Sequence, residues 1–396
     1  MILPWTRRWW AGFLTSVATM LAGACAPVGS GGPAAITPPG APRLTFLGEV
    51  TRPSGTVYPQ LPDSSRFGSM SGLARDAASG QWLAVIDDRA GTRVAWLSIA
   101  AGDGPLEVTP LRMQALTAGP GVDARLATQA DLEAIVALPD GTFLMSEEGH
   151  VTRDGAWPPA ILQVTREGVV TGLVPFPREF QLSADGKTGL RDNQGFESLT
   201  RTPDGRVIAG LEQPLLEYPV TSPAQGGEGR LIEFAPDGRG WKPGRQWRYP
   251  IAPTPTVPGF PQACSDGENG LVELLALTDT TLLSMERACW LDAAGTSPAN
   301  TILIFWVTLE GAAARKTLLL DLSTLTPKLS PALARLDNFE GLSFGPPVGG
   351  RPTLLVMSDD NFRPTQSTSF LLFGMGSALE QMVPRGLTPS LALSPR

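Results

Sequence analysis

Acidic residues recur at matching positions in a short apolar pattern that appears five times along the 396-residue chain. One set begins the first apolar segment of a repeat: Glu133, Glu197, Glu273 and Glu340. A second set ends the following apolar segment: Asp87, Glu147, Glu212, Glu286 and Asp359. If folding gathers these carboxylates at one place, their mutual repulsion requires that some be protonated, paired with a base or bound to a cation.

Clustered carboxylate and amide oxygens are the ligands that hard divalent cations prefer, and Ca²⁺ is the cation we expect. The predicted metal ligands are Asp87, Asp88, Glu133, Glu197, Glu340, Asp359 and Asp360. Further acids stand beside the two sets, at Asp131, Glu148, Asp192 and Asp337. The alternative is that each acid caps the backbone N–H groups of a neighbouring turn, because a repeat fold also reuses structural solutions.

Such a site suits hydrolysis of an ester, since a bound cation activates water and an arginine can hold an anionic oxygen. A glutamate such as Glu147 would accept the proton from water. We predict a catalytic set of Glu147, Glu212, Glu286 and Arg287. The predicted substrate-binding set is Arg89, Asn193, Asn338 and Asn361.

Several other chemistries are excluded by composition. His150 is the only histidine, so a Ser–His–Asp triad would have to use it, and no G-x-S-x-G motif accompanies it. No phosphate-binding loop, dinucleotide glycine motif or C-x-x-C pattern occurs. The net charge is −7 without a basic stripe, which argues against nucleic acid as a partner.

The acids sit in predicted β-hairpins at residues 71–88, 133–148, 197–213, 273–287 and 340–360. Pro139-Asp140-Gly141 and Pro203-Asp204-Gly205 are turn sequences between the two strands of their repeats. Because the strands are antiparallel, the start of one lies beside the end of the next. Both acidic sets should therefore meet at the same end of each hairpin, opposite the turns.

Two further strands follow each hairpin except the last, so the repeats match the four-stranded blades of an all-β propeller. The last repeat has one outer strand, at 369–375, and the strand at 43–50 is expected to supply its fourth. That pairing would close the ring and remove its open edge. We favour five blades; six blades and an open β-sandwich are the alternatives.

The first residues read as a targeting segment, in which Arg7 and Arg8 precede an apolar stretch too short to span a membrane comfortably. Leu21-Ala22-Gly23-Ala24-Cys25 resembles a bacterial lipoprotein signal that would make Cys25 the lipidated residue; an ordinary signal peptide cut after Ala24 is the alternative. We expect a signal peptide at 1–24, a lipidated Gly/Pro-rich tether at 25–42, the propeller at 43–375 and a tail at 376–396. The protein should then face the periplasm or exterior, touching the membrane of the cell envelope only through its lipid.

Two cysteines remain beyond the targeting segment, Cys264 and Cys289. In an oxidising compartment an even pair suggests a disulfide, and both residues flank the acidic end of the fourth hairpin. Two buried free thiols are the alternative.

At the acidic positions the sequence resembles the phytase-like (esterase-like phytase) domain family over about residues 43–375. The most specific blocks are N-x-G-F-E at 193–197, D-N-x-E-G at 337–341 and S-D-D-N-F at 358–362. The resemblance implies a propeller, export and a phytase- or esterase-like activity on a small-molecule ester or phosphate. The site residues that it implies are Asp87, Asp88, Glu133, Glu147, Glu197, Glu212, Glu286, Arg287, Glu340, Asp359, Asp360 and Asn361.

Two other functions are open at this point. The same mouth would suit a non-catalytic envelope lipoprotein that binds a carbohydrate or protein partner. A lactonase-like propeller hydrolase is the other, since such enzymes also place acid and amide metal ligands in a central channel. The sequence does not predict an oligomeric state.

Overall fold

The computed structural model describes residues 42–62, 66–102, 104–152, 155–183, 186–238, 240–264 and 268–384. The expected signal peptide, Cys25 and the tether up to residue 41 lie outside the described residues. The described residues form one compact unit. Among the described residues, no helix has the length and apolar character needed to cross a membrane.

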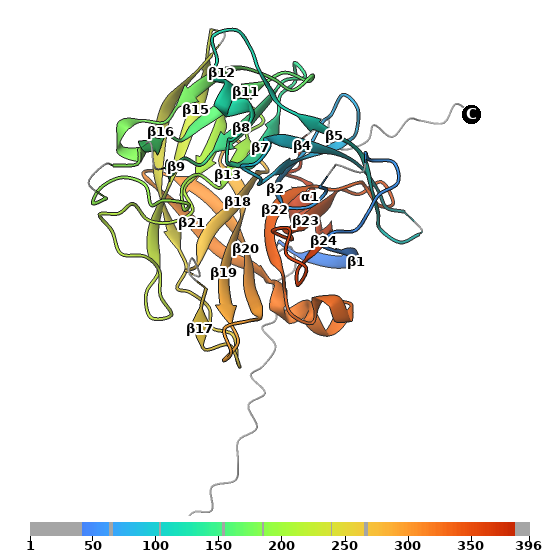
Figure 1. Cartoon of the computed structure of the whole chain (residues 1–396). Helices are drawn as coiled ribbons and strands as arrows, with labels where there is room; N and C mark the ends of the chain where they lie inside the picture. Colours follow the sequence, from blue (N-terminus) through green and yellow to red (C-terminus); the bar gives the residue numbers. More distant parts are fainter. Residues whose placement is uncertain are drawn as a thin grey trace, which may run out of the picture. The chain divides into compact units, whose positions relative to one another are not determined.

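The unit is built of β-strands, as the sequence predicts, and the strands fall into mainly antiparallel groups (Figure 1). The first group has the order β2-β3-β4-β5. Its strands are β2 (Met70–Arg75), β3 (Trp82–Ile86), β4 (Arg93–Ala100) and β5 (Glu107–Ala115).

The second group has the order β6-β12-β11-β8-β7 and a separate small hairpin of β9 and β10 beside it in sequence. The strands are β6 (Thr117–Ala118), β7 (Leu132–Ala137), β8 (Phe143–Glu147), β9 (His150–Thr152), β10 (Gly155–Trp157), β11 (Ala160–Val164) and β12 (Val169–Pro175).

The third and fourth groups are joined into one sheet by a short parallel pairing of β16 with β21, at Arg248 and Ala313. The third contains β13 (Ser198–Arg201), β14 (Val207–Gly210), β15 (Gly227–Asp237) and β16 (Gly240–Ile251). The fourth contains β17 (Gln262–Ala263), β18 (Gly270–Ala276), β19 (Thr281–Leu291), β20 (Pro298–Glu310) and β21 (Ala313–Asp321).

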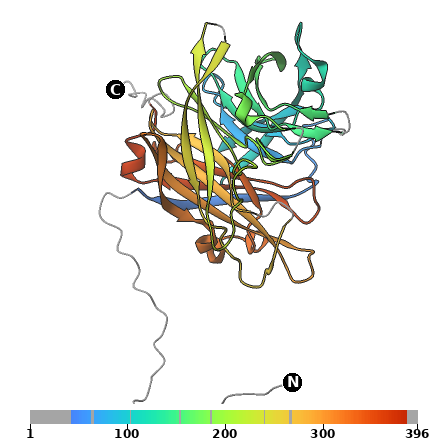
Figure 2. The same cartoon turned by 90° about the vertical axis from the view of Figure 1, so that its left-hand side faces the viewer.

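The last group is completed by the N-terminal strand. Its order is β1-β24-β23-β22, and β1 pairs with β24 from Leu44 opposite Met375 to Pro53 opposite Ser367. Figure 2 shows this blue strand running beside the red and orange C-terminal strands. The four strands are β1 (Leu44–Pro53), β22 (Asn338–Phe344), β23 (Thr353–Asp359) and β24 (Ser367–Met375).

The first strands of the five hairpins contact one another in succession. β2 contacts β7, β7 contacts β13, β13 contacts β18, β18 contacts β22, and β22 contacts β2. The approach is close at Gly72 of β2, where an added Cβ would lie 2.6 Å from the Cα of Ala134 in β7. A side chain at this position would therefore push the two backbones apart. We call β2, β7, β13, β18 and β22 the inner strands.

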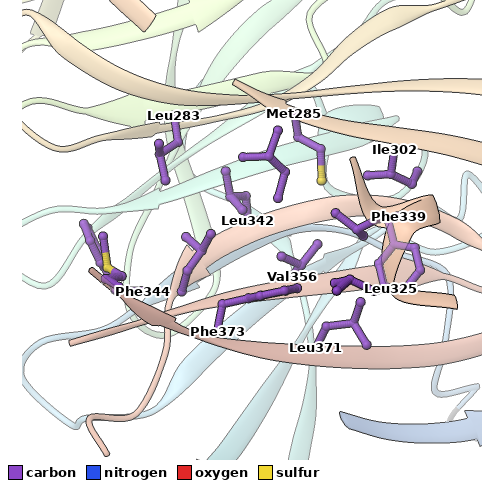
Figure 3. Close-up of a cluster of buried hydrophobic side chains, with 14 of the residues drawn as sticks. Leu283, Met285, Ile302, Leu325, Phe339, Leu342, Phe344, Val356, Leu371 and Phe373 are labelled. Atoms are coloured by element: carbon purple, nitrogen blue, oxygen red, sulfur yellow. The ribbon is translucent and has the colours of Figure 1, made fainter. Parts of the chain in front are cut away.

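Hydrophobic clusters fill the spaces between successive groups. Figure 3 shows the cluster between the fourth group and the last, where Met285 of β19 and Phe339 of β22 meet Phe373 of β24. Another cluster joins the first group to the last, through residues such as Leu97 of β4 and Leu372 of β24. Each group therefore buries side chains on both of its faces.

Short helical turns occur outside the strands, at Ala124–Ala127, Arg178–Phe180, Leu322–Lys328, Pro331–Leu333 and, as α1, at Ser377–Glu380. Part of the segment expected as a tail from residue 376 is packed on the domain. Leu379 and Val383 are buried in the cluster between the fourth and last groups, so residues 376–384 pack on the domain. Residues 385–396 lie outside the described part of the chain.

Candidate functional site

A cavity of about 470 Å³ lies where the inner strands begin, and acidic side chains line it. Its carboxylates are Asp87, Glu133, Glu197, Glu212, Glu340 and Asp359. Arg287, Asn193, Asn338 and Asn361 share the lining. The hairpins bring these residues together as expected, because inner strands start there and their antiparallel partners end there. We call this space the acidic cavity.

The carboxylates form two groups of three that share Glu133. In the first, oxygens of Asp87, Asp131 and Glu133 lie within 4.8 Å of one another. In the second, Glu133 is grouped in the same way with Glu148 and Glu197. Glu133 is only 8% exposed and its side chain lines the cavity, and no described residue donates a hydrogen bond to its carboxylate. A buried carboxylate without a donor is costly, so this group is poised to take a proton or a cation.

Glu148 is similarly under-satisfied. Its Oε1 accepts a hydrogen bond from the backbone N–H of Gly195 at 2.7 Å, but its buried Oε2 has no donor. A proton shared with Glu197 would supply a hydrogen bond between the two carboxyl groups. Without that proton, Oε2 is free to bind a cation.

Burial and mutual repulsion raise the pKa of the acids in this cavity. Burial, followed by the charge of Asp131, raises the pKa of Asp87 to about 8. Burial is also the largest cause of the raised pKa values of Glu133, Glu148, Glu197, Glu340 and Asp359. The site therefore has more potential negative charge than it can hold ionised at neutral pH without a compensating cation.

Arg287 supplies positive charge inside the acidic cavity. Its Nη2 lies 3.0 Å from Glu340 Oε1 and 3.7 Å from Glu212 Oε1. Burial alone would lower the pKa of Arg287, but the surrounding carboxylates, led by Glu340, raise it. Its Nε is buried and has no hydrogen-bond partner, while the Arg287 side chain lines the acidic cavity.

Arg89 joins Asp131 and Asn193 at the rim of the acidic cavity. Its Nη2 donates to Asp131 and, at 2.6 Å, to Asn193 Oδ1. Asn193 has φ 58° and Asn361 has φ 47°, the left-handed region that asparagine tolerates better than most residues. Strained backbone of this kind is common where a side chain must be aimed into a site. Asn338 Nδ2 donates to Glu340 Oε1 at 2.9 Å.

Asp88 and Asp360, predicted as metal ligands, lie outside the acidic cavity and hold neighbouring loops instead. Asp88 accepts from Arg93 at 2.8 Å and from the N–H of Ala90. Asp360 accepts from the N–H groups of Ser69 and Phe362 at 2.8 and 3.0 Å. Each is thus a capping acid, the alternative that the sequence left open.

Glu147 and Glu286, predicted as catalytic, face away from the cavity. Glu147 accepts the backbone N–H groups of Asp131 and Gly149 at 2.6 and 3.2 Å. Glu286 is bound by Lys316, and it accepts from Tyr249 Oη at 2.8 Å. Because successive side chains of a strand point to opposite faces, the next residues along the chain, Glu148 and Arg287, reach the site instead.

Glu273, at the start of the fourth hairpin, also lies outside the acidic cavity. It is 2% exposed and accepts the N–H groups of Leu274 and Leu199 at 2.9 and 3.4 Å. Asp131 and Glu148 are the site residues missing from the predicted ligand set. Both lie within two residues of an acid of the repeat pattern. The sequence shows this closeness but does not show which of the neighbouring acids faces the site.

The rim of the acidic cavity carries a disulfide between Cys264 and Cys289, with Cα atoms 5.4 Å apart. It ties β17 to β19 beside their pairing at Ala263 and Trp290. His150 is 9% exposed and stacks on Trp157 with ring centroids 5.7 Å apart. It lies beside Glu147 rather than in the cavity lining.

A family model described as "Phytase-like: Esterase-like activity of phytase" matches residues 65–362. No curated protein sequence matches the chain significantly.

Similar solved structures include an endo-arabinase from Bacteroides thetaiotaomicron, 13% identical, covering 78% of this chain and 94% of the other at a TM-score of 0.40. A putative glycoside hydrolase from Parabacteroides distasonis is 12% identical, covering 77% and 86%, with a TM-score of 0.39. An exo-1,5-α-L-arabinanase from a bovine ruminal metagenomic library is 11% identical, covering 78% and 93%, with a TM-score of 0.34. Likeness at this level has no bearing on substrate.

Proposed function

Because the chain belongs to the phytase-like family, we propose that it is a metal-assisted hydrolase of phosphate esters or other small-molecule esters, acting at the acidic cavity. The observation that carries the proposal is Glu133, a buried carboxylate without a hydrogen-bond donor that two groups of acids share. A purely structural acid would be capped, as Asp360 is.

The donor set fits a hard cation. All donors in the two groups are carboxylate oxygens, and the Glu148 Oε2 atom lacks a partner. We propose that Asp87, Asp131, Glu133, Glu148 and Glu197 hold one or more divalent cations, with Ca²⁺ favoured. When bound, the cation would offset the carboxylate charge, polarise an ester oxygen and activate water.

The chain's own groups would then bind and orient the substrate. Arg287, which lines the cavity, would hold an anionic oxygen through its guanidinium, while Glu340 and Glu212 fix the guanidinium in place. We propose Glu212 as the proton acceptor in place of Glu147, since both oxygens of Glu147 already accept backbone N–H groups. Asn193, Asn338 and Asn361 line the same space as substrate contacts.

We further propose that the strand groups are five blades of a closed propeller, with β1 completing the last blade. The successive contacts of the inner strands and the cluster joining the first and last groups support this count. Export and lipidation at Cys25 remain proposals that rest on the sequence alone. Labelling with a radioactive fatty acid should mark the native chain and not a Cys25→Ser variant; equal labelling would contradict the assignment.

The activity is tested with chromogenic phosphate monoesters, phosphate diesters and carboxylate esters, each with Ca²⁺ and with chelator. We expect turnover that needs the cation and falls by about a hundredfold or more in Glu133→Gln and in Arg287→Gln. Glu107→Gln, an exposed acid on β5, is the control that should keep full activity. If no ester is turned over in any condition, the enzyme proposal fails and a binding role for the same cavity takes its place.

A further inference from the structure

A second cavity, of about 500 Å³, lies at the opposite ends of the inner strands. The last three residues of each inner strand line it: Leu73–Arg75, Ile135–Ala137, Leu199–Arg201, Leu274–Ala276 and Leu342–Phe344. The lining is mostly apolar and contains no carboxylate. We call it the apolar cavity, and the proposed hydrolysis does not use it.

Two arginines interrupt the apolar lining at equivalent strand positions. Arg75 ends β2 and Arg201 ends β13, and both are half-buried. Within the described part of the chain, neither guanidinium forms an ion pair. Asp76, next to Arg75, is bound by Arg166 at 2.5 Å, and Asp204 is bound by Arg206 at 2.7 Å.

The Arg75 guanidinium lies over the Trp82 ring, 5.4 Å from its centroid, and has no anionic partner among the described residues. Its Nε is buried without a hydrogen-bond partner, and burial lowers the pKa of this group. A cation in such surroundings is stabilised when an anion binds beside it, because the charge-assisted hydrogen bond replaces the lost hydration.

We propose that the apolar cavity binds a long-chain carboxylate, with the hydrocarbon chain among the leucines and the carboxylate between Arg75 and Arg201. The volume lies in the range of small-molecule pockets, roughly 300–1,000 Å³, which combine apolar walls with a few polar groups. Removing the hydrocarbon from water supplies the driving force, and the two arginines select the anionic head. The acidic cavity would repel the same ligand.

The chain itself offers another occupant, since Pro384 lines the apolar cavity and residues 385–396 follow it. That segment, RGLTPSLALSPR, contains Arg385 and Arg396 and no acidic side chain. The side chains of this segment offer Arg75 and Arg201 only like charge, whereas a long-chain carboxylate carries its negative charge without a cation beside it. Charge complementarity therefore favours an external anion.

The test measures binding of dodecanoate and of dodecanol to the full mature chain at neutral pH by titration calorimetry. We expect one molecule of dodecanoate per chain and about tenfold or more weaker binding of the neutral alcohol, because the charged hydrogen bonds are lost. Arg75→Gln combined with Arg201→Gln should reduce the dodecanoate affinity to that of the alcohol. Arg335→Gln, an exposed arginine outside this cavity, is the matched control and should change nothing.

Leu275→Trp provides a second variant that does not alter charge, since it fills the cavity from β18 and should block both ligands. Equal affinity of dodecanoate and dodecanol, or full dodecanoate binding by the double arginine variant, would overturn the proposal. Binding that appears only in a chain ending at Pro384 would also overturn it, because residues 385–396 would then be the native occupant.

Discussion

At the scale of single residues, the acidic cavity depends on a balance between carboxylates and Arg287. Buried ions lose their hydration, and the loss is offset only while each has a partner. Glu340 lies 3.0 Å from Arg287 and also accepts from Asn338, so it is the better-satisfied partner of this guanidinium. Glu133 has no comparable contact, which makes the two acids chemically distinct within one cavity.

Replacing Arg287 tests this balance. Arg287→Gln should lower the free energy of unfolding by about 3–5 kcal/mol in chelator, since Glu340 and Glu212 lose their buried cation. Arg287→Gln with Glu340→Gln should cost less than the sum of the single changes, as measured by urea unfolding in a double-mutant cycle. Arg315→Gln, in an exposed pair with Glu310, should have little effect. Strictly additive costs would show that the two groups are not coupled.

Neighbouring charged residues show how much of the candidate site the sequence predicts. The repeat correctly predicts that Asp87, Glu133, Glu197, Glu212, Glu340 and Asp359 gather in one cavity. It also predicts Arg287 as a site residue, but it does not predict that Glu147 and Glu286 face away or that Glu148 joins the acids of the site. A shift of one residue reverses the face of every side chain in a strand, and spacing alone does not determine the shift.

At the scale of elements, β-bulges in the inner strands aim some of the acids into the acidic cavity. Four of the five inner hairpins change register near the acidic cavity, between Met70 and Leu73, Leu132 and Ile135, Leu271 and Glu273, and Phe339 and Gly341. The extra residue of a bulge turns a side chain out of the regular alternation. Glu133 and Glu340 lie within two of these bulges and reach the site. Turn chemistry predicts the hairpins, but no comparable residue signal predicts the bulges.

Strand β1 gives the element-scale prediction. A chain that starts at Ser54 should aggregate, because β24 then presents an unpaired edge and Val50 no longer covers its hydrophobic neighbours. Light scattering and gel filtration compare it with a chain that starts at Gly40, which should stay soluble.

A synthetic peptide of residues 42–53 should restore solubility to the shortened chain by strand addition. An unaided shortened chain that remains monomeric with an unchanged melting temperature would contradict the role given to β1.

At the scale of the whole molecule, the buried acids make stability depend on pH. Burial raises the folded-state pKa of Asp87 and of Glu147 to about 8, above ordinary unfolded values. Each group therefore adds stability that is complete below its unfolded pKa of about 4 and is lost as pH rises through its folded pKa. Asp76 has a lowered folded-state pKa. Its contribution to stability is therefore present above its unfolded pKa of about 4 and is lost as the pH falls below that value.

We expect the free energy of unfolding in chelator to fall steadily from about pH 5 to about pH 9. Saturating Ca²⁺ should flatten this dependence, because the cation would replace the protons among the carboxylates. Urea unfolding at several pH values, with and without Ca²⁺, measures both curves. Stability that rises with pH in chelator would contradict the charge distribution described for the acidic cavity.

The pairing of β1 with β24 has a consequence for how the protein is made. β1 is translated first, and its partner follows roughly 300 residues later, a delay of about 15–60 s at the usual speed of a ribosome. Until then the nascent polypeptide cannot complete its last sheet, so co-translational folding stays unfinished and an unprotected strand is available to other chains. A holding chaperone that binds the first 50 or so residues of the domain during this interval should raise the yield of native protein.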